Sequence, residues 1–319
     1  MLDASITNDM LGDGVCTVQG KQVKHQPDIV DIDKQTITVP PHISKHCSNV
    51  ELSLDVMHVN NMPFLISLSE HLHHGAIGVI DNLCCETLND RLKLFIRSYA
   101  IRGFRITMIL VDMQCKALKD RNLIGVAFNV VSRDEHVPKI ERFIRVIKER
   151  GHCYYAMMSF SYLSRTMVVH LMKNVMFYVN VFVWKKGASQ VLPPLTIVEG
   201  TLLDYNFHFR IMFGEFVQTY EGTTNAIETR AIDAIALEPN GKMQCGVHCF
   251  SLVSGRGLCR AWKNVTTQKM TENTIRRINF MDKKQSSTKG LRFGYKKMTL
   301  IVCIVQEWML HHTGMTKMT

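Results

Sequence analysis

One short apolar run constrains the fold of this chain more than any other feature. Residues 106–111, Ile-Thr-Met-Ile-Leu-Val, are continuously apolar and partly β-branched, and they end abruptly at Asp112. Such a run is typical of a strand that is buried on both faces, as in a sheet covered by helices. A carboxylate at the end of a buried strand is costly unless it is paired, hydrated or bound to a metal. The run therefore predicts an α/β fold and marks Asp112 as a candidate site residue.

The flanking sequence predicts further elements around this strand. Strands are predicted at residues 50–56, 62–68 and 75–80, the first of them from its alternation of apolar and polar residues. A helix with apolar spacing from Leu88 to Tyr99 is predicted next, with Gly103 at its end. A second helix begins at Pro138, has Ile140, Ile144 and Ile147 on one face, and is expected to stop at Gly151. Three strands, a helix, a fourth strand and a later helix are the order of a ribonuclease-H-like mixed sheet with flanking helices.

The remaining sequence predicts a division into four parts. From about Phe207, short strands alternate with turn residues such as Pro239-Asn240-Gly241, which indicates a small β-rich module. After Asn273 the sequence becomes basic and polar. We therefore expect a linker at 1–45, a ribonuclease-H-like core with a trailing helix at 46–200, the β-rich module at 201–270 and a basic tail at 271–319.

Charge and hydropathy restrict the environment and the partners. Thirty-eight Lys and Arg against 28 Asp and Glu give a formal charge of +10, which favours a polyanionic partner, although a merely solvated basic surface has the same composition. The longest apolar stretch, Met167 to Trp184, is interrupted by His170, Lys173 and Asn174, so a buried helix is expected and not a membrane span. With no signal-peptide pattern either, the expected location is the nucleus or the cytoplasm.

Three carboxylates occupy positions suited to phosphoryl transfer. Asp55 lies in the first predicted strand, Asp112 at the end of the fourth, and Glu141 on the helix that follows. Carboxylates from separate elements can hold a pair of divalent ions, Mg²⁺ or Mn²⁺, which activate the attacking oxygen and stabilise the leaving oxygen. Two alternatives remain: aspartates also end strands because turns follow, and Asp134 or Glu135 could supply the third carboxylate.

Basic residues accompany Glu141 on the same predicted helix. They recur at three-residue steps and are Lys139, Arg142, Arg145 and Lys148. A basic stripe beside a carboxylate suits an enzyme that acts on a nucleic-acid backbone, because phosphate contacts position the substrate. A solvated helix face would show the same pattern.

Three motifs around the carboxylates resemble a known family. They are Leu54-Asp55-Val56-Met57-His58-Val59-Asn60, Leu110-Val111-Asp112-Met113 and Pro138-Lys139-Ile140-Glu141-Arg142. The segment from Val50 to Glu149 resembles the integrase core of Ty1/copia-type retrotransposon polyproteins. Downstream, Leu237-Glu238-Pro239-Asn240-Gly241 and Arg260-Ala261-Trp262 resemble the small SH3-like domain that follows this core.

The resemblance implies a DNA-integrating polynucleotidyl transferase. Asp55, Asp112 and Glu141 would be catalytic and metal-binding, Mg²⁺ or Mn²⁺ the cofactor, and DNA the partner; a homo-oligomer remains open. The chain also departs from the family. Only 141 − 112 − 1 = 28 residues separate the second and third acids, and Met113-Gln114-Cys115-Lys116 replaces the usual Asn-Gly-Gly-Glu. The alternative is therefore a catalytically inactive nucleic-acid-binding remnant.

Two clusters of histidine and cysteine are not expected to be metal sites. The first contains His71, His73 and His74 near Cys84-Cys85, and its spacing fits no familiar zinc site. The second contains Cys245, His248, Cys249 and Cys259, whose side chains are expected to alternate between the faces of strands and to pack in the core.

Overall fold

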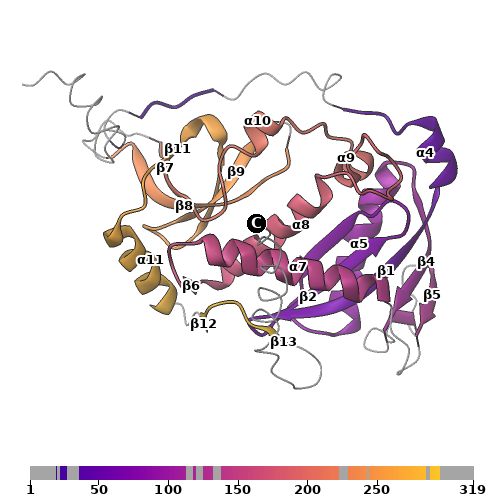
Figure 1. Ribbon diagram of the computed structural model, residues 1–319. Helices are drawn as coiled ribbons and strands as arrows, with labels where there is room; N and C mark the ends of the chain where they lie inside the picture. The colour runs from indigo at the N-terminus through magenta and orange to yellow at the C-terminus, as the bar shows by residue number, and fades with distance from the viewer. Residues whose placement is uncertain are drawn as a thin grey trace, which may run out of the picture.

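The computed structural model contains two sheets with helices packed between and around them (Figure 1). It describes residues 19, 22–26, 36–112, 118–119, 125–131, 138–222, 229–242, 244–284 and 288–294. Within these ranges, no helix has the length and the apolar character needed to cross a membrane.

The first sheet is mixed and has the ribonuclease-H-like order. Its strands are β1 (Asn49–Val59), β2 (Met62–Ser69), β3 (Gly75–Val79), β4 (Arg105–Val111), β5 (Ala127–Val130) and β13 (Phe293–Gly294). They are arranged β3-β2-β1-β4-β5, with β13 also paired to β1. Strand β2 pairs antiparallel with both β1 and β3, whereas β4 pairs parallel with both β1 and β5. This order confirms the predicted fold class.

Helices cover both faces of this sheet. On β1, Leu52 and Leu54 face the core formed with α5 (Cys85–Ile101). Met57 and Val59 face the opposite core, formed with α7 (Pro138–Met157) and α8 (Arg165–Asn180). The alternation follows from the two-residue period of a strand, and it places Asp55 on the same face as Met57 and Val59.

The second sheet is antiparallel and lies in the region predicted to be β-rich. Its strands are β7 (Phe216–Tyr220), β8 (Ala231–Pro239), β9 (Gly246–Ser251), β10 (Gly257–Ala261) and β11 (Val265–Thr267), in the order β10-β9-β8-β7-β11. Strands β7 to β10 form a meander, and β11 pairs back with β7. A short 3₁₀ helix, η2 (Trp262–Asn264), precedes β11.

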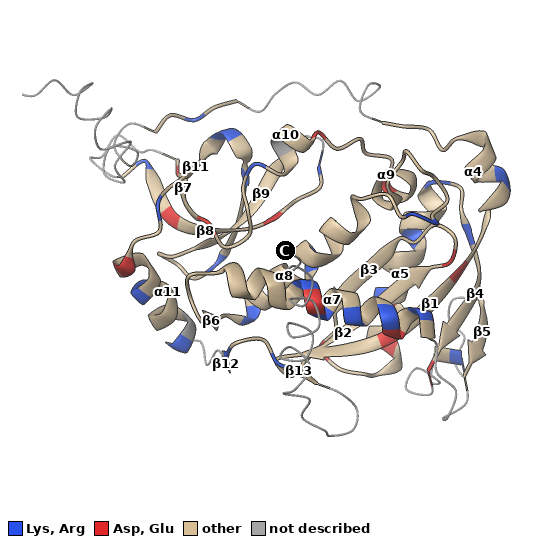
Figure 2. Cartoon of the chain, in the orientation of Figure 1, with Lys and Arg blue, Asp and Glu red and all other residues tan. Residues whose placement is uncertain are grey.

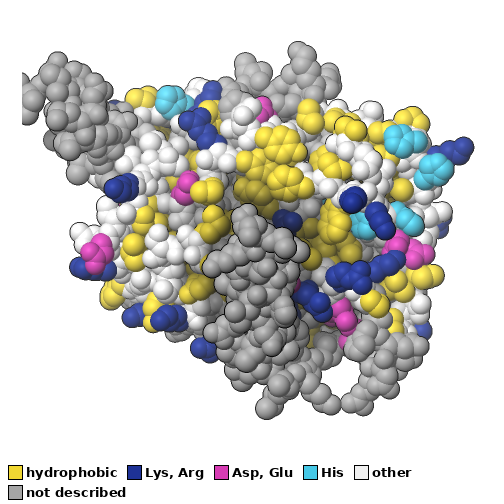
Figure 3. Space-filling model, in the orientation of Figure 1, with side chains coloured by type: hydrophobic (Ala, Val, Ile, Leu, Met, Phe, Trp, Pro, Cys, Tyr) yellow, Lys and Arg dark blue, Asp and Glu magenta, His cyan; other side chains and the backbone are white. Residues whose placement is uncertain are grey.

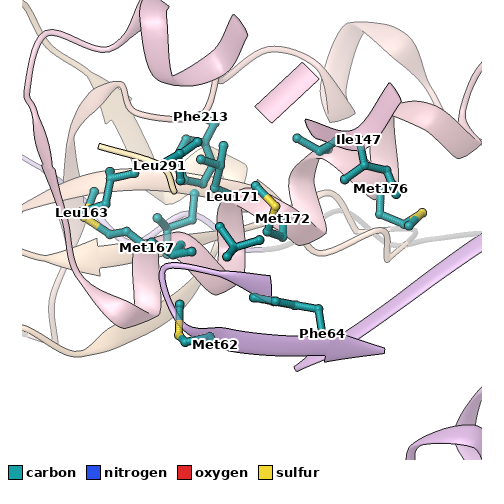
Figure 4. Close-up of a cluster of buried hydrophobic side chains, with 14 of the residues drawn as sticks. Met62, Phe64, Ile147, Leu163, Met167, Leu171, Met172, Met176, Phe213 and Leu291 are labelled. Carbon is teal, nitrogen blue, oxygen red and sulfur yellow. The ribbon is translucent and has the colours of Figure 1, made fainter. Parts of the chain in front are cut away.

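Helix α8 lies between the two sheets and joins them into one core (Figures 1 and 4). Leu171, Met172 and Val175 of α8 are fully buried. The same cluster contains Phe64 of β2 on one side and Phe250 of β9 on the other. A helix that is apolar around most of its circumference is stable only when other elements cover it on several sides.

Shorter elements connect or extend these layers. They are α4 (Pro41–His46), α9 (Pro194–Glu199), α10 (Tyr205–His208), α11 (Glu272–Lys284) and the two-stranded pair β6 (Tyr162–Leu163) with β12 (Thr288–Lys289).

Two sequence expectations differ from the structure. Gly151 does not end α7, which continues to Met157, because this glycine lies where the helix approaches Met172 of α8. Part of the segment predicted as a basic tail is folded: α11 buries Ile278, and β13 pairs with β1, so residues 272–284 and 288–294 cover the core. Composition showed that this segment is basic but did not show its amphipathic helix.

The predicted N-terminal linker also contacts the rest of the chain. The backbone N–H of His25 donates to the Asn264 side chain at 2.7 Å, and the Gln22 side chain donates to the Asn264 backbone oxygen at 3.1 Å. Ile37 N–H donates to the Gly200 carbonyl at 2.9 Å. These described parts of residues 1–45 are therefore attached to the surface of the module and the core.

The contact between α8 and β3 yields a test of how the layers are held. Asn180 is 3% exposed, and its side chain accepts from Gly75 N–H at 2.9 Å and donates to Gly75 C=O at 2.7 Å. We expect Asn180→Ala to lower the free energy of unfolding by about 2–4 kcal/mol, because both Gly75 groups would remain buried without these bonds. Urea denaturation measures the change.

The exposed Asn273→Ala on α11 is the matched control, with an expected change within about 0.5 kcal/mol. Equal effects of the two substitutions would contradict the proposed role of Asn180.

Candidate active site

The pairing of β1 with β4 brings Asp55 and Asp112 to adjacent positions. The parallel register pairs Leu54 with Val111, so Asp55 and Asp112 are the next residues along the two strands. Neighbouring strands lie about 4.8 Å apart. Leu54 and Val111 both face the α5 side. The two aspartates therefore point to the opposite face, toward α7.

Helix α7 brings Glu141 to this face together with Lys148. These residues are seven positions apart, about two helical turns, so they lie on one side of α7. Asp55 interacts electrostatically with Glu141, Lys148 and Asp112. The structure therefore places the three predicted carboxylates, from β1, the end of β4 and α7, on one face of the sheet and within electrostatic range of Asp55.

The environment of Asp55 disfavours its ionised form. The pKa of Asp55 is raised to about 6, mainly by burial and to a smaller extent by the negative charges of Asp112 and Glu141. The Val56 N–H, which donates to Asp55 Oδ1 at 2.7 Å, and the positive charge of Lys148 lower this pKa. An excess of negative charge at one point is the condition that a bound cation relieves.

The chemistry of these groups fits a divalent metal ion. Carboxylate oxygens are the protein ligands that Mg²⁺ and Mn²⁺ prefer, and one or two of them are enough when water completes the coordination. Asp112 and Glu141 are partly or largely exposed, so the cluster is accessible from solvent. The cluster therefore offers oxygen ligands, carries negative charge and is open to solvent.

The predicted basic stripe divides into an exposed part and a buried part. Lys139, Arg142 and Arg145 are exposed, and Lys139 pairs with Glu70. Lys148 is only 8% exposed, beside Asp55 and 5.9 Å from the centre of the Phe293 ring. Three-residue steps do not stay on one face of an α-helix: from Lys139 to Lys148 (148 − 139 = 9) the helix turns about two and a half times. Lys148 thus faces the carboxylates rather than solvent.

Basic residues still outnumber acidic residues along α7. Figure 2 shows more Lys and Arg than Asp and Glu on this helix, and Figure 3 shows basic side chains gathered over it in the same view. Arg142 and Arg145 therefore present positive charge next to the carboxylate cluster.

The other sequence hypotheses have mixed outcomes. Asp134 and Glu135, the alternative third carboxylates, lie outside the described residues. His73 stacks on Trp184, and buried His74 contacts the Tyr99 hydroxyl. Each of these two histidines therefore contacts an aromatic residue and not the other histidine. Of the four residues predicted to pack in the core near the second sheet, Cys245 and Cys249 are buried, as predicted. Cys259 is exposed and His248 is half-buried, so the prediction is wrong for these two residues.

Sequence reasoning missed one cluster. His170 on α8, Glu238 on β8 and His248 on β9 lie together, with candidate ligand atoms within 4.8 Å of one another. Within the described part of the chain it is the only group of three or more His, Cys, Asp or Glu whose ligand atoms lie close enough to share one metal ion, and the oxygens of Asp55, Asp112 and Glu141 are not gathered this closely. No local spacing could reveal it, because tertiary packing brings its residues together from three separate elements.

Comparisons with known proteins concern the fold. No protein-family model and no curated protein sequence matches the chain. Among solved structures, the catalytic core domain of BIV integrase resembles it with 14% sequence identity and a TM-score of 0.35, over 46% of this chain and 92% of that domain. The ribonuclease-H-like topology is assigned from the strand order and register, not from this likeness.

The pKa of Asp55 predicts how the cluster affects stability. Between about pH 4 and pH 6 the folded state keeps on Asp55 a proton that the unfolded state has released, so the contribution of Asp55 to stability falls as pH rises and then levels off. Buried His74, whose pKa is lowered to about 4, contributes in the opposite direction over this range. We expect Asp55→Asn to remove the Asp55 contribution, so that the slope of stability against pH becomes more positive and the free energy of unfolding at about pH 8 increases by roughly 1–3 kcal/mol.

Urea denaturation at about pH 4 and pH 8 measures both quantities. Asp90→Asn, at an exposed position of α5, is the control and should keep the slope of the original protein. An Asp55→Asn variant with an unchanged slope would show that Asp55 is not the group responsible.

Proposed function

We propose that this chain is an integrase-like polynucleotidyl transferase that processes 3′ ends of DNA and joins them to target DNA. The observation that carries the proposal is the convergence of Asp55, Asp112 and Glu141 at one face of a ribonuclease-H-like sheet. Phosphoryl transfer needs little covalent chemistry from the protein; it needs positioning and electrostatic stabilisation. A cluster of carboxylates beside basic residues supplies both.

The residues of the cluster have separate roles in this proposal. Asp55, Asp112 and Glu141 would hold Mg²⁺ or Mn²⁺, which when bound activates a water or a 3′-hydroxyl and stabilises the leaving oxygen. Buried Lys148 would orient a phosphate near the carboxylates, since its charge already lies beside Asp55. Exposed Arg142 and Arg145 would contact the DNA backbone on either side.

The second sheet supports the proposed relation to Ty1/copia-type polyproteins. Five antiparallel strands in the order β10-β9-β8-β7-β11, with a 3₁₀ helix before the last, suit an SH3-like module. We propose the ribonuclease-H-like core at 46–200 and the SH3-like module at 201–270, with residues 1–45 and 271–319 as flanking segments. The motifs of the sequence resemblance coincide with β1, the end of β4 and the start of α7.

A second candidate is a catalytically inactive DNA-binding remnant. The 28 residues between Asp112 and Glu141, and the absence of the family's Asn-Gly-Gly-Glu sequence, favour it. Buried Lys148 also favours it, because a fixed positive charge beside Asp55 partly compensates the carboxylates without a metal ion. Both candidates bind DNA, and only the first one joins it.

Strand transfer separates the two candidates. With Mg²⁺ or Mn²⁺ and labelled duplexes that carry candidate element ends, we expect joined product from the full chain. Metal ions supply several kcal/mol of transition-state stabilisation, so Asp112→Asn and Glu141→Gln should each reduce the joining rate by at least about 100-fold. Gel analysis of the labelled product measures the rate.

Asp90→Asn, far from the cluster on α5, should leave the joining rate unchanged. Joining that persists in Asp112→Asn would contradict the role of this residue. Binding without joining across duplexes with different ends would favour the inactive remnant.

The DNA-binding surface is tested by the salt dependence of affinity. Each phosphate contact contributes about 0.9 to the slope of log K against log salt concentration, so Arg142→Ala/Arg145→Ala should reduce its magnitude by about 2. Fluorescence anisotropy over a range of salt concentrations measures the slope. The matched double variant Lys93→Ala/Arg97→Ala, exposed on α5 across the sheet, should keep it. Equal slopes in both double variants would exclude this face of α7.

A further inference from the structure

The cluster of His170, Glu238 and His248 lies where α8 crosses the second sheet. Nδ1 of His170 lies 2.7 Å and 2.6 Å from the two carboxylate oxygens of Glu238. The His170 and His248 rings have centroids 5.4 Å apart. The Glu238 side chain is 8% exposed and that of His170 16%, so water screens this contact only weakly.

A β-bulge aims Glu238 into this cluster. The register of β8 and β9 pairs Ala236 with Cys249 and then Pro239 with Val247, so two residues of β8 oppose the single residue His248. Without the extra residue, strict alternation would direct the side chains of Leu237 and Glu238 to opposite faces of the sheet. With it, Leu237 is buried in the core while Glu238 contacts His170. Bulges of this kind often re-aim a side chain at a functional site.

The donor set discriminates between metal ions. Two imidazoles and one carboxylate are ligands typical of zinc and related transition metals, whereas Mg²⁺ prefers oxygen ligands alone. Ligand atoms about 2.0–2.2 Å from a tetrahedral ion lie roughly 3.4 Å apart. The candidate atoms here are within 4.8 Å of one another, and the shortest pairs are 2.6–2.7 Å apart. Side-chain adjustments of about 1 Å would therefore form the site.

We propose that His170, Glu238 and His248 bind one transition-metal ion of the zinc class, which fastens α8 to the β8–β9 bulge. Three protein ligands leave a coordination position open. Glu238 and His248 line a cavity of about 370 Å³, together with Lys173, Asn180, Glu199 and Asn240. This cavity gives the ion a route of entry. The site is separate from the carboxylates of β1, β4 and α7, and it does not depend on the function proposed for them.

Cobalt binding to the full chain tests the site directly. All variants carry Asp112→Asn, so that ions bound at the carboxylate cluster contribute less to the measured number of Co²⁺ ions per chain. After removal of metal by chelation, the protein is titrated with Co²⁺ under reducing conditions, and visible absorption reports coordination by nitrogen ligands. His248→Gln removes one ligand and leaves the contact between His170 and Glu238 in place. His25→Gln, at an exposed histidine outside the cluster, is the matched control.

We expect the parent and His25→Gln to bind one more equivalent of Co²⁺ than His248→Gln, or to bind it more than about tenfold tighter. Co²⁺ and Zn²⁺ should raise the Tm of the parent and the control by a few degrees and leave that of His248→Gln unchanged. If His248→Gln loses its cooperative unfolding transition without metal, the near-isosteric Glu238→Gln replaces it, with the same expected loss.

Identical stoichiometry, affinity and Tm shift in the parent and in the ligand variant would overturn the proposal. In that case Co²⁺ binds elsewhere, for example at the chain's free cysteines, and the contact of His170 with Glu238 is a metal-free ion pair between α8 and β8.

Discussion

The burial of α8 on both sides is the constraint on which the rest of this structure depends. The helix carries apolar residues around most of its surface, and Val168, Leu171, Met172 and Val175 are all essentially inaccessible to solvent. Each such side chain contributes about 1.5–3 kcal/mol when it is removed from water. One sheet could cover only one flank of this helix. The mixed sheet and the β-rich sheet must therefore lie on opposite flanks, and methionines such as Met172 and Met176 fill the irregular space between them.

This packing also fixes both candidate sites. Helix α7 packs against α8 and β1, and its position sets the side of the helix that meets the sheet. Glu141 and Lys148, seven residues apart, lie on that side, next to Asp55. On another side of α8, His170 meets Glu238 where β8 bulges. The two sites differ in chemistry, because one is built from carboxylates on one face of the mixed sheet and the other from imidazoles around a single carboxylate.

The carboxylate cluster is a place where function and stability oppose each other. Burial and two neighbouring negative charges raise the pKa of Asp55, so its ionised form weakens the folded state at neutral pH. Lys148 offsets part of this repulsion from within the protein. A divalent cation, either free or bound to a phosphate group, would offset more of this repulsion. In the proposed function, ligand binding by these carboxylates accounts for this cost.

The sequence by itself determined the fold class of the core, four of its strands with their order along the chain, and the positions of Asp55, Asp112 and Glu141 on their elements. These follow from local patterns: strand alternation, buried apolar runs and helical spacing are written in short windows of residues. It did not determine that Gly151 lies inside α7 or that α11 and β13 cover the core, because close helix packing and long-range pairing decide both. Tertiary structure alone decided that Lys148 faces inward and that His170, Glu238 and His248 meet. Their proximity depends on the crossing of a helix over a bulged strand pair, and no spacing along the chain encodes that crossing.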